Sequence, residues 1–209
     1  MKPLILIGGG GHCKSVIEAA ESVGREIRGI LDLPEYYGTE CLGYKIIGSD
    51  DDIPKFVGEC EFIVTLGFIK NPAPRIRLHR LVEKHGGNFA TVIASTAHVS
   101  RHAAVGDGTV ILHHATVNAG ARIGFGCIIN TASNIEHDVT VKDFSHVSTG
   151  AMINGDCTVG ESCFIGSGAV VANGVSIVNG CIVGAGSMVY KDIHASGIYV
   201  GTPVRRISE

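Results

Sequence analysis

The chain has 209 residues, with 17 Lys and Arg against 20 Asp and Glu, so its formal net charge is -3. This near-balance argues against a nucleic-acid-binding protein, which would carry a basic cluster. With 45% hydrophobic and only 18% charged residues, the composition is that of a folded chain rather than a disordered one. The 29 glycines indicate many tight turns.

No apolar segment is long enough to cross a membrane or to act as a secretory signal. Residues 4–7 are apolar but run directly into Gly8, whereas a membrane span needs about 20 residues. The seven cysteines include no Cys-x-x-Cys pair, so no metal site is expected from them. We therefore expect reduced thiols and a cytoplasmic protein with no membrane span.

Residues 1–92 alternate between predicted strands and predicted helices. Short apolar runs predict strands over residues 4–7, 27–31, 62–66 and 89–93. Helices are expected over residues 12–23, 49–56 and 72–84. This alternation is typical of a small parallel α/β unit.

Three glycines, one histidine and one aspartate follow the ends of these strands. They are Gly10, Gly11, His12, Asp32 and Gly67. Ligands of parallel α/β units bind at the carboxyl ends of the strands, where glycines let the backbone approach a phosphate. A nucleotide phosphate site is expected here. A plain strand–helix turn stays open as the alternative, because Cys13 replaces the third glycine of Gly-x-Gly-x-x-Gly.

From residue 93 onward the sequence repeats every six residues. Sixteen positions, counted in steps of six from Val99 to Val189, are all Val or Ile without any insertion. A period of six fits neither a helix nor a heptad, and it predicts short strands that turn a corner every six residues, as in a hexapeptide β-helix. Three hexads form one coil in such proteins, so residues 18 apart share a column and about five coils are expected.

A second position of each hexad is also predicted to face the interior. The residue two places before each aliphatic one is small, and this slot holds four cysteines: Cys127, Cys157, Cys163 and Cys181. A free cysteine packs as a small hydrophobic residue, so we expect all four in the core.

The same register turns six histidines outward: His102, His113, His114, His137, His146 and His194. His137 is the strongest catalytic candidate, because Asp138 follows it and can orient the imidazole. Gly155 lies one coil further in the same column, where its bare N–H can face an oxyanion. Asn130, on the preceding hexad, is expected nearby.

One column of outward residues is strongly apolar. It comprises Val110, Ile128, His146, Phe164 and Ile182. An exposed apolar stripe marks an interface, and a three-sided prism suits threefold symmetry, so a homotrimer is predicted. His146 lies half a coil from His137, on a different side of the prism. A neighbouring chain would therefore bring its own His137 toward this His146, which places the active sites between subunits.

The chain resembles the left-handed β-helix acyltransferases and, over essentially its whole length, the bacterial NeuD-type sugar acetyltransferases. This group includes the PglD-like enzymes that N-acetylate UDP-4-amino-4,6-dideoxy sugars. The stretches that carry the resemblance are Gly8-Gly9-Gly10-Gly11-His12, Ile30-Leu31-Asp32, Asn130-Thr131-Ala132-Ser133, Glu136-His137-Asp138, Phe144-Ser145-His146-Val147-Ser148 and Gly201-Thr202-Pro203.

The resemblance implies two domains. Residues 1–92 would form a Rossmann-like α/β domain that binds a nucleotide sugar, and residues 93–209 would form a left-handed parallel β-helix with acetyltransferase activity. It further implies that His137 is the general base, that Asp138 raises its basicity, and that the Gly155 N–H binds the thioester carbonyl.

The remaining site residues implied by the resemblance bind the two substrates, and no metal is implied. His146, Ser167 and Ala185 would line the groove for acetyl-CoA, the co-substrate. The nucleotide sugar would be bound by Gly10, Gly11, His12, Asp32, Gly67 and Asn130.

Three alternatives stay open. The acceptor can be a hydroxyl of a sialic-acid-like sugar instead of an amine. A γ-type carbonic anhydrase uses the same prism but needs three convergent histidines, and His113 and His137 do not share a column. The third alternative is a nucleotide-sugar-binding module without catalysis.

Overall fold

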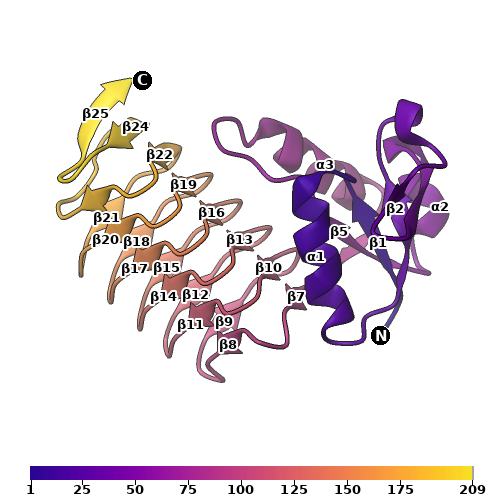
Figure 1. Cartoon of the computed structure of the whole chain (residues 1–209), viewed down its shortest axis with the longest axis horizontal. Coiled ribbons are helices and arrows are strands. Elements are labelled where there is room, and N and C mark those ends of the chain that lie inside the picture. The colour runs from indigo at the N-terminus through magenta and orange to yellow at the C-terminus, as the bar shows by residue number, and fades with distance from the viewer. Residues whose placement is uncertain (209) are drawn as a thin grey trace. The chain divides into compact units, whose positions relative to one another are not determined.

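The structure, a computed structural model, describes residues 1–208 and divides the chain into two compact units, Met1–Ser95 and Thr96–Glu209. Figure 1 shows the first unit in indigo to purple and the second in magenta to yellow. The first unit extends past residue 92, because β7 (Val92–Ile93) contacts α1 (Gly11–Glu21) and the Ser95 N–H donates to the Ser22 hydroxyl at 3.0 Å. No helix of the described residues is long and apolar enough to cross a membrane.

The first unit is built on a six-stranded sheet in the order β3-β4-β2-β1-β5-β6. All its strand pairs are parallel except the β3–β4 hairpin at one edge. The strands are β1 (Leu4–Ile7), β2 (Ile27–Leu31), β3 (Glu40–Cys41), β4 (Tyr44–Gly48), β5 (Glu61–Val64) and β6 (Asn88–Phe89). The helices are α1, α2 (Ile53–Phe56) and α3 (Ala73–Lys84), with 3-10 turns at Pro34–Tyr36 and Asp50–Asp52.

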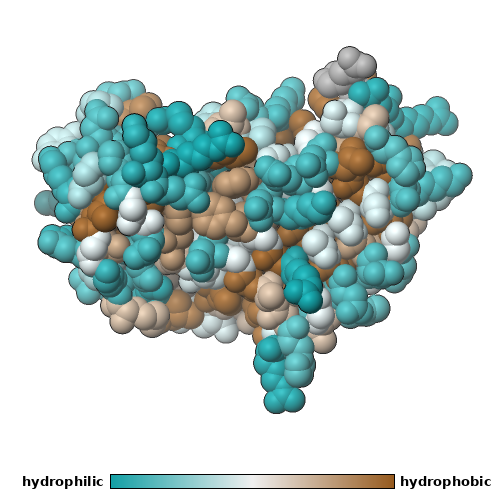
Figure 2. Space-filling model, turned by 180° about the vertical axis from the view of Figure 1, so that it is seen from behind, coloured by the Kyte–Doolittle hydropathy of each residue, from teal (hydrophilic) through white to brown (hydrophobic). Residues whose placement is uncertain are grey.

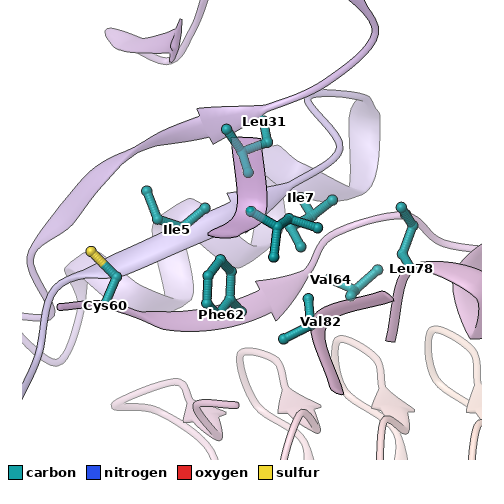
Figure 3. Close-up of a cluster of buried hydrophobic side chains, with 9 residues drawn as sticks. Ile5, Ile7, Leu31, Cys60, Phe62, Val64, Leu78 and Val82 are labelled. Carbon is teal, nitrogen blue, oxygen red and sulfur yellow. The ribbon is translucent and has the colours of Figure 1, made fainter. Parts of the chain in front are cut away.

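The core of the first unit accounts for the apolar runs in its strands. Ile5 and Ile7 of β1 and Phe62 of β5 pack with Leu78 and Val82 of α3, as Figure 3 shows. The alternate residues Leu4, Leu6 and Ile63 point to the opposite face and are also fully buried. Both faces of the sheet are therefore covered, which is why its strands are continuously apolar rather than alternating.

The expected parallel α/β unit is confirmed, with differences in detail. The sequence analysis misses the β3–β4 hairpin, because its turn at Leu42-Gly43 lacks the usual Asn-Gly pair, although both residues have positive φ (49° and 82°). The helix expected over residues 49–56 is a 3-10 turn followed by α2, with a capping box at Ser49. The last predicted strand is divided into β6 and β7.

The second unit is a stack of very short strands that form three sheets. These strands are β8 (His98–Val99), β9 (Ala104–Val105), β10 (Val110–Ile111), β11 (Thr116–Val117), β12 (Arg122–Ile123), β13 (Ile128–Ile129), β14 (Asn134–Ile135), β15 (Thr140–Val141), β16 (His146–Val147), β17 (Met152–Ile153), β18 (Thr158–Val159), β19 (Phe164–Ile165), β20 (Val170–Val171), β21 (Ser176–Ile177), β22 (Cys181–Val183), β23 (Met188–Val189), β24 (Gly197–Val200) and β25 (Arg205–Ser208). Successive strands belong to different sheets, so the chain climbs as a three-sided β-helix (Figure 1).

We name the three faces of this prism after one outward residue of each. The His146 face contains β10, β13, β16, β19 and β22, and β24 and β25 extend it. The Met152 face contains β8, β11, β14, β17, β20 and β23. The Arg122 face contains β9, β12, β15, β18 and β21. Along the chain, the His146 face leads to the Met152 face and then to the Arg122 face.

The six-residue register is confirmed. Strands pair in parallel with partners one coil away, such as Thr116 with Asn134 and Asn134 with Met152. The repeated Val and Ile residues are buried from Ile111 onward, and only Val99 and Val105 in the first coil are partly exposed. The four cysteines of the second slot are at most 1% exposed.

The prediction that the Val110–Ile182 column is an exposed apolar stripe is wrong. Val110 and Ile128 are fully buried, and His146 and Phe164 are only 7% and 8% exposed. An outward direction does not ensure exposure, because side chains of one column stack on each other. The rings of His146 and Phe164, for example, meet edge to face with centroids 5.1 Å apart.

Large apolar side chains do reach the surface, as the brown areas of Figure 2 illustrate. On the prism they include Met152 and Met188, which are 44% and 40% exposed, and both lie on the Met152 face. These two exposed methionines therefore lie on a different face from the one expected to carry the apolar stripe.

Candidate active site

His137 and Asp138 form a hydrogen-bonded pair at a corner of the prism. They lie in the turn between β14 of the Met152 face and β15 of the Arg122 face. Nδ1 of His137 meets Oδ2 of Asp138 at 2.9 Å, and both side chains are well exposed, at 60% and 65%. Because Nδ1 is engaged by the carboxylate, Nε2 is the ring nitrogen left to exchange protons with a substrate.

Asp138 is held in place by the turn itself. Its backbone has a φ of 62°, a left-handed conformation that Asp tolerates better than most residues, and its N–H donates to the Ala119 carbonyl at 3.1 Å. The carboxylate occupies the space above Gly120, one coil earlier, where any Cβ would collide with it. Sequence reasoning missed Gly120, yet the 18-residue spacing from Asp138 could have found it.

Gly155 provides the matching space on the other side of the pair. A Cβ at this position would lie 2.6 Å from both Cε1 and Nε2 of His137, so the imidazole keeps this position only above a glycine. Among the hydrogen bonds of the described residues, the Gly155 N–H donates to no other group. The structure therefore brings a ring nitrogen and an available N–H donor together, as the sequence predicts.

The surrounding charges favour the protonated form of His137. The hydrogen bond with the Asp138 carboxylate raises the pKa of His137 above its ordinary value, and the negative charges of Glu136 and Asp156 act in the same direction. A histidine with a raised pKa is a stronger base once it is neutral, which suits proton removal from a nucleophile.

Glu136, directly before the histidine, is fixed by two amides that sequence reasoning did not identify. Its Oε2 accepts a hydrogen bond from Asn118 Nδ2 and its Oε1 accepts one from Asn134 Nδ2, both at 2.9 Å. The Asn134 bond is the main reason that the pKa of Glu136 lies below its ordinary value, and Asn118 adds to it. Glu136 is thus an anion held in one orientation beside His137.

A second group of predicted residues lies on and after the His146 face. His146 Nε2 meets Asn130 Nδ2 at 3.1 Å, and Ser148 Oγ meets Ser167 Oγ at 3.0 Å. Ser167 and Ala185 are exposed and lie one coil apart at the corner that leads to the Met152 face. This corner therefore offers small side chains and two hydroxyl groups to a ligand.

Two expectations about this group need correction. His146 points outward as expected but is nearly buried, because Phe164 packs against its ring and Asn130 Nδ2 meets its Nε2. Asn130 belongs with His146 and does not lie in the turn of His137, since it follows β13 of the His146 face. Asn130 does lie one hexad before His137, but successive hexads belong to different faces of the prism.

His137 and His146 consequently belong to different faces of one prism. The first lies at the corner between the Met152 and Arg122 faces, and the second lies on the His146 face. This separation is what the sequence predicts for two histidines nine residues apart.

The residues predicted for a nucleotide site in the first unit lie around the end of the central strand β1. Asp32, after β2, accepts the Gly9 N–H through Oδ2 at 2.6 Å and the Leu33 N–H through Oδ1 at 2.7 Å. Gly67, after β5, lies against His12, since a Cβ there would be 3.5 Å from the His12 Cβ. The strand ends thus meet where the chain passes from one side of β1 to the other, the usual ligand position in such sheets.

Gly10 and Gly11 face open space at the start of α1. A Cβ at either residue would meet no atom within 4 Å, so neither glycine is required by packing within the protein. Their bare backbone instead leaves room for a ligand to approach the helix N-terminus.

Among residues 1–208, no group of three His, Cys, Asp or Glu side chains is arranged to hold a metal ion. His113, one of the histidines considered for zinc, has its Nδ1 2.8 Å from the Thr96 hydroxyl. The ring of His113 also lies near that of His114, with centroids 6.2 Å apart.

Comparisons with known proteins show which family the chain resembles. Residues 3–81 match the PglD N-terminal domain, and residues 156–191 match the bacterial transferase hexapeptide family with its six repeats. No curated protein matches the chain. A solved structure of perosamine N-acetyltransferase from Caulobacter crescentus, a His-to-Asn mutant in complex with CoA and GDP-perosamine, is 30% identical with a TM-score of 0.93. That match covers 100% of this chain and 98% of the other. The chain belongs to the PglD-like sugar acetyltransferases.

Two further solved structures resemble the present chain over nearly its whole length. The acetyltransferase domain of PglB from Neisseria gonorrhoeae FA1090, in complex with acetyl coenzyme A, is 28% identical with a TM-score of 0.89, and the match covers 99% of each chain. WeeI from Acinetobacter baumannii AYE shares the fold at 24% identity, with a TM-score of 0.87, over 99% of this chain and 100% of that one.

Family membership confirms the predicted fold, an N-terminal α/β unit followed by a left-handed β-helix. It also confirms the predicted class of enzyme, an acetyl-CoA-dependent sugar acetyltransferase. This class replaces the carbonic anhydrase and the binding module considered above.

Proposed function

We propose that this protein acetylates the amino group of a nucleotide-linked 4-amino-4,6-dideoxy sugar, with acetyl-CoA as the donor and His137 as the general base. The observation that carries this proposal is the position of the His137 imidazole, whose Nδ1 is held by Asp138 and whose Nε2 lies above Gly155. Perosamine, the sugar bound by the relative from Caulobacter crescentus, supports an amine as the acceptor.

The transfer is direct and needs no covalent enzyme intermediate. The lone pair of the sugar nitrogen attacks the thioester carbonyl carbon, and the carbonyl oxygen becomes an oxyanion that accepts the Gly155 N–H. His137 Nε2 takes a proton from the nitrogen. The C–S bond then breaks, the sulfur leaves with its electron pair, and the proton on His137 passes to it. The products are an amide and the CoA thiol. General-base catalysis of this kind contributes roughly 10² to 10⁴ in rate.

Each unit has its own task in this proposal. In the first unit, Gly10, Gly11 and the α1 N-terminus bind the phosphates, while Asp32, His12 and Gly67 surround the rest of the nucleotide. In the second unit, His146, Ser167 and Ala185 line the path of acetyl-CoA, and Asn130, beside His146, contacts the nucleotide sugar.

We further propose a homotrimer whose active sites combine two chains. The support is twofold: His137 and His146 belong to different faces of one prism, and the Met152 face carries exposed methionines that a neighbouring chain would cover.

The test is a product analysis with the purified protein. Acetyl-CoA is incubated with a UDP- or GDP-linked 4-amino-4,6-dideoxyhexose, with the matching 4-hydroxy sugar nucleotide, or with a free sialic acid. CoA release and product mass are then measured. We expect N-acetylation of the amino sugar nucleotide alone. Acetyl transfer only to a hydroxyl would establish O-acetylation instead, and the absence of transfer to all three would contradict the proposal.

A further inference from the structure

Glu136 is the group beside the proposed base that the mechanism above does not use. It follows β14 on the Met152 face and is partly buried, and its two oxygens accept one amide hydrogen bond each, from Asn118 and from Asn134. A carboxylate has about four acceptor positions, so these two bonds and a third from the His137 backbone N–H leave acceptor capacity on the carboxylate.

The arrangement keeps Glu136 anionic without neutralising it. Its hydrogen-bond partners, the side-chain amides of Asn118 and Asn134 and the backbone N–H of His137, are uncharged, and no lysine or arginine forms an ion pair with this carboxylate among the residues described. Glu136 interacts electrostatically with the imidazolium of His137. The imidazolium lowers the pKa of Glu136, and the carboxylate raises the pKa of His137. The carboxylate is therefore a fixed negative charge next to the proposed site of transfer.

An amino sugar and a hydroxy sugar differ in charge at the group that accepts the acetyl group. A primary aliphatic amine is largely an ammonium ion at neutral pH, whereas a hydroxyl is neutral. A fixed carboxylate accepts a hydrogen bond from either group, but only the ammonium ion adds the attraction between two opposite charges.

We propose that the Glu136 carboxylate, fixed by Asn118 and Asn134, binds the ammonium form of the acceptor and thereby selects amino sugars over hydroxy sugars. This inference rests on the proposed function. The ammonium ion donates one N–H to Glu136 as the substrate binds and then loses one proton to solvent. The neutral nitrogen attacks the thioester, and its next proton goes to His137 as described above.

The two amides also explain how a carboxylate and a general base can be neighbours without pairing with each other. Asn118 and Asn134 fix both oxygens of Glu136, while Asp138 holds Nδ1 of His137 at 2.9 Å. Each functional group thus has its own partners, and both stay available to the substrate.

The test compares binding of the substrate with binding of its acetylated product, which is neutral at the same position. Calorimetry gives both Kd values for the wild type, for Glu136→Gln and for Glu136→Asp. Glu161→Gln is the matched control, because Glu161 is an exposed carboxylate in another turn of the prism. We expect Glu136→Gln to weaken binding of the amino sugar nucleotide about tenfold or more and to change binding of the product less than about twofold. Glu136→Asp, which keeps the charge, should recover part of the loss.

If Glu136 has a purely structural role, Glu136→Gln should weaken binding of substrate and product equally. If Glu136 has no role in binding, the substitution should weaken neither. Both outcomes overturn the inference. The wild type gives a test that depends on no variant, since the 4-amino sugar nucleotide should bind at least about tenfold more tightly than the 4-hydroxy one. Equal affinities there also overturn it. Failure of the proposed function is distinguishable, because it appears in the wild type as absent turnover of the amine.

Discussion

The two histidines of the prism differ in almost every property that the structure measures. The His137 side chain is 60% exposed and is positioned by one carboxylate and one glycine. His146 is 7% exposed and is held between Phe164 and Asn130. An exposed base needs its substrate or a neighbouring chain to exclude water, whereas a buried imidazole is already fixed. This difference fits the roles proposed above, in which His137 is the base and His146 lines the acetyl-CoA groove.

Removal of the His137 imidazole is the strongest way to break this comparison. We expect His137→Ala to lower kcat by about 10² or more and to leave acetyl-CoA affinity nearly unchanged, because the ring acts on the proton and not on the cofactor. Steady-state kinetics and calorimetry give the two quantities. His194→Ala, at another exposed position, is the control. An equal loss in both variants would contradict a special role for His137.

Gly155→Ala tests the space beneath the imidazole. The added methyl group would lie 2.6 Å from two ring atoms of His137, so the ring must move away from the N–H donor. We expect kcat to fall by about 10-fold to 10²-fold, since removal of one oxyanion donor costs up to about 10³. Thermal melting should change little, because the ring is exposed and free to shift. Unchanged kcat would show that the close approach has no catalytic value.

Mixing of two inactive chains tests whether the sites are shared. His137→Ala and His146→Ala chains, refolded together, should form trimers in which about a quarter of the interfaces combine an intact His137 with an intact His146. Activity should then exceed that of either variant alone. If mixed trimers form and activity does not recover, each site takes both histidines from one chain.

The comparison also shows what a single sequence can and cannot supply. The period of six determines which residues face inward, and the 18-residue spacing brings His137 to Gly155 without any structure. The same arithmetic misjudges the Val110–Ile182 column, because direction alone does not say what packs over a side chain. It likewise assigns Asn130 to the wrong histidine. The two hydrogen bonds from Asn118 and Asn134 to Glu136 depend on side-chain rotamers, which the six-residue period does not predict.

Asp138→Asn should have a smaller effect than loss of His137 and a clear signature in pH. The Asp138 carboxylate raises the pKa of His137, so its removal lowers that pKa, although Glu136 and Asp156 still contribute negative charge. The base must be neutral to accept a proton, so kcat/KM should rise with pH through the His137 pKa. The midpoint of this rise should shift to lower pH in Asp138→Asn, and the plateau should fall because the base is weaker. A midpoint that stays fixed or moves to higher pH would contradict the assignment.

The thiols give the smallest effect but test the register on which both histidine positions depend. All seven cysteines are buried. Burial raises the pKa of Cys157 in the prism above its ordinary value, and it raises the pKa of Cys13 in the first unit to about 12. A thiol reacts as its thiolate, so native protein should react slowly with Ellman's reagent and react fully only in denaturant. Rapid labelling of Cys127, Cys157, Cys163 and Cys181 in the native state would mean that the second slot does not face the interior. The outward positions of His137 and Asp138 would then lose their basis, since they are counted from the same register.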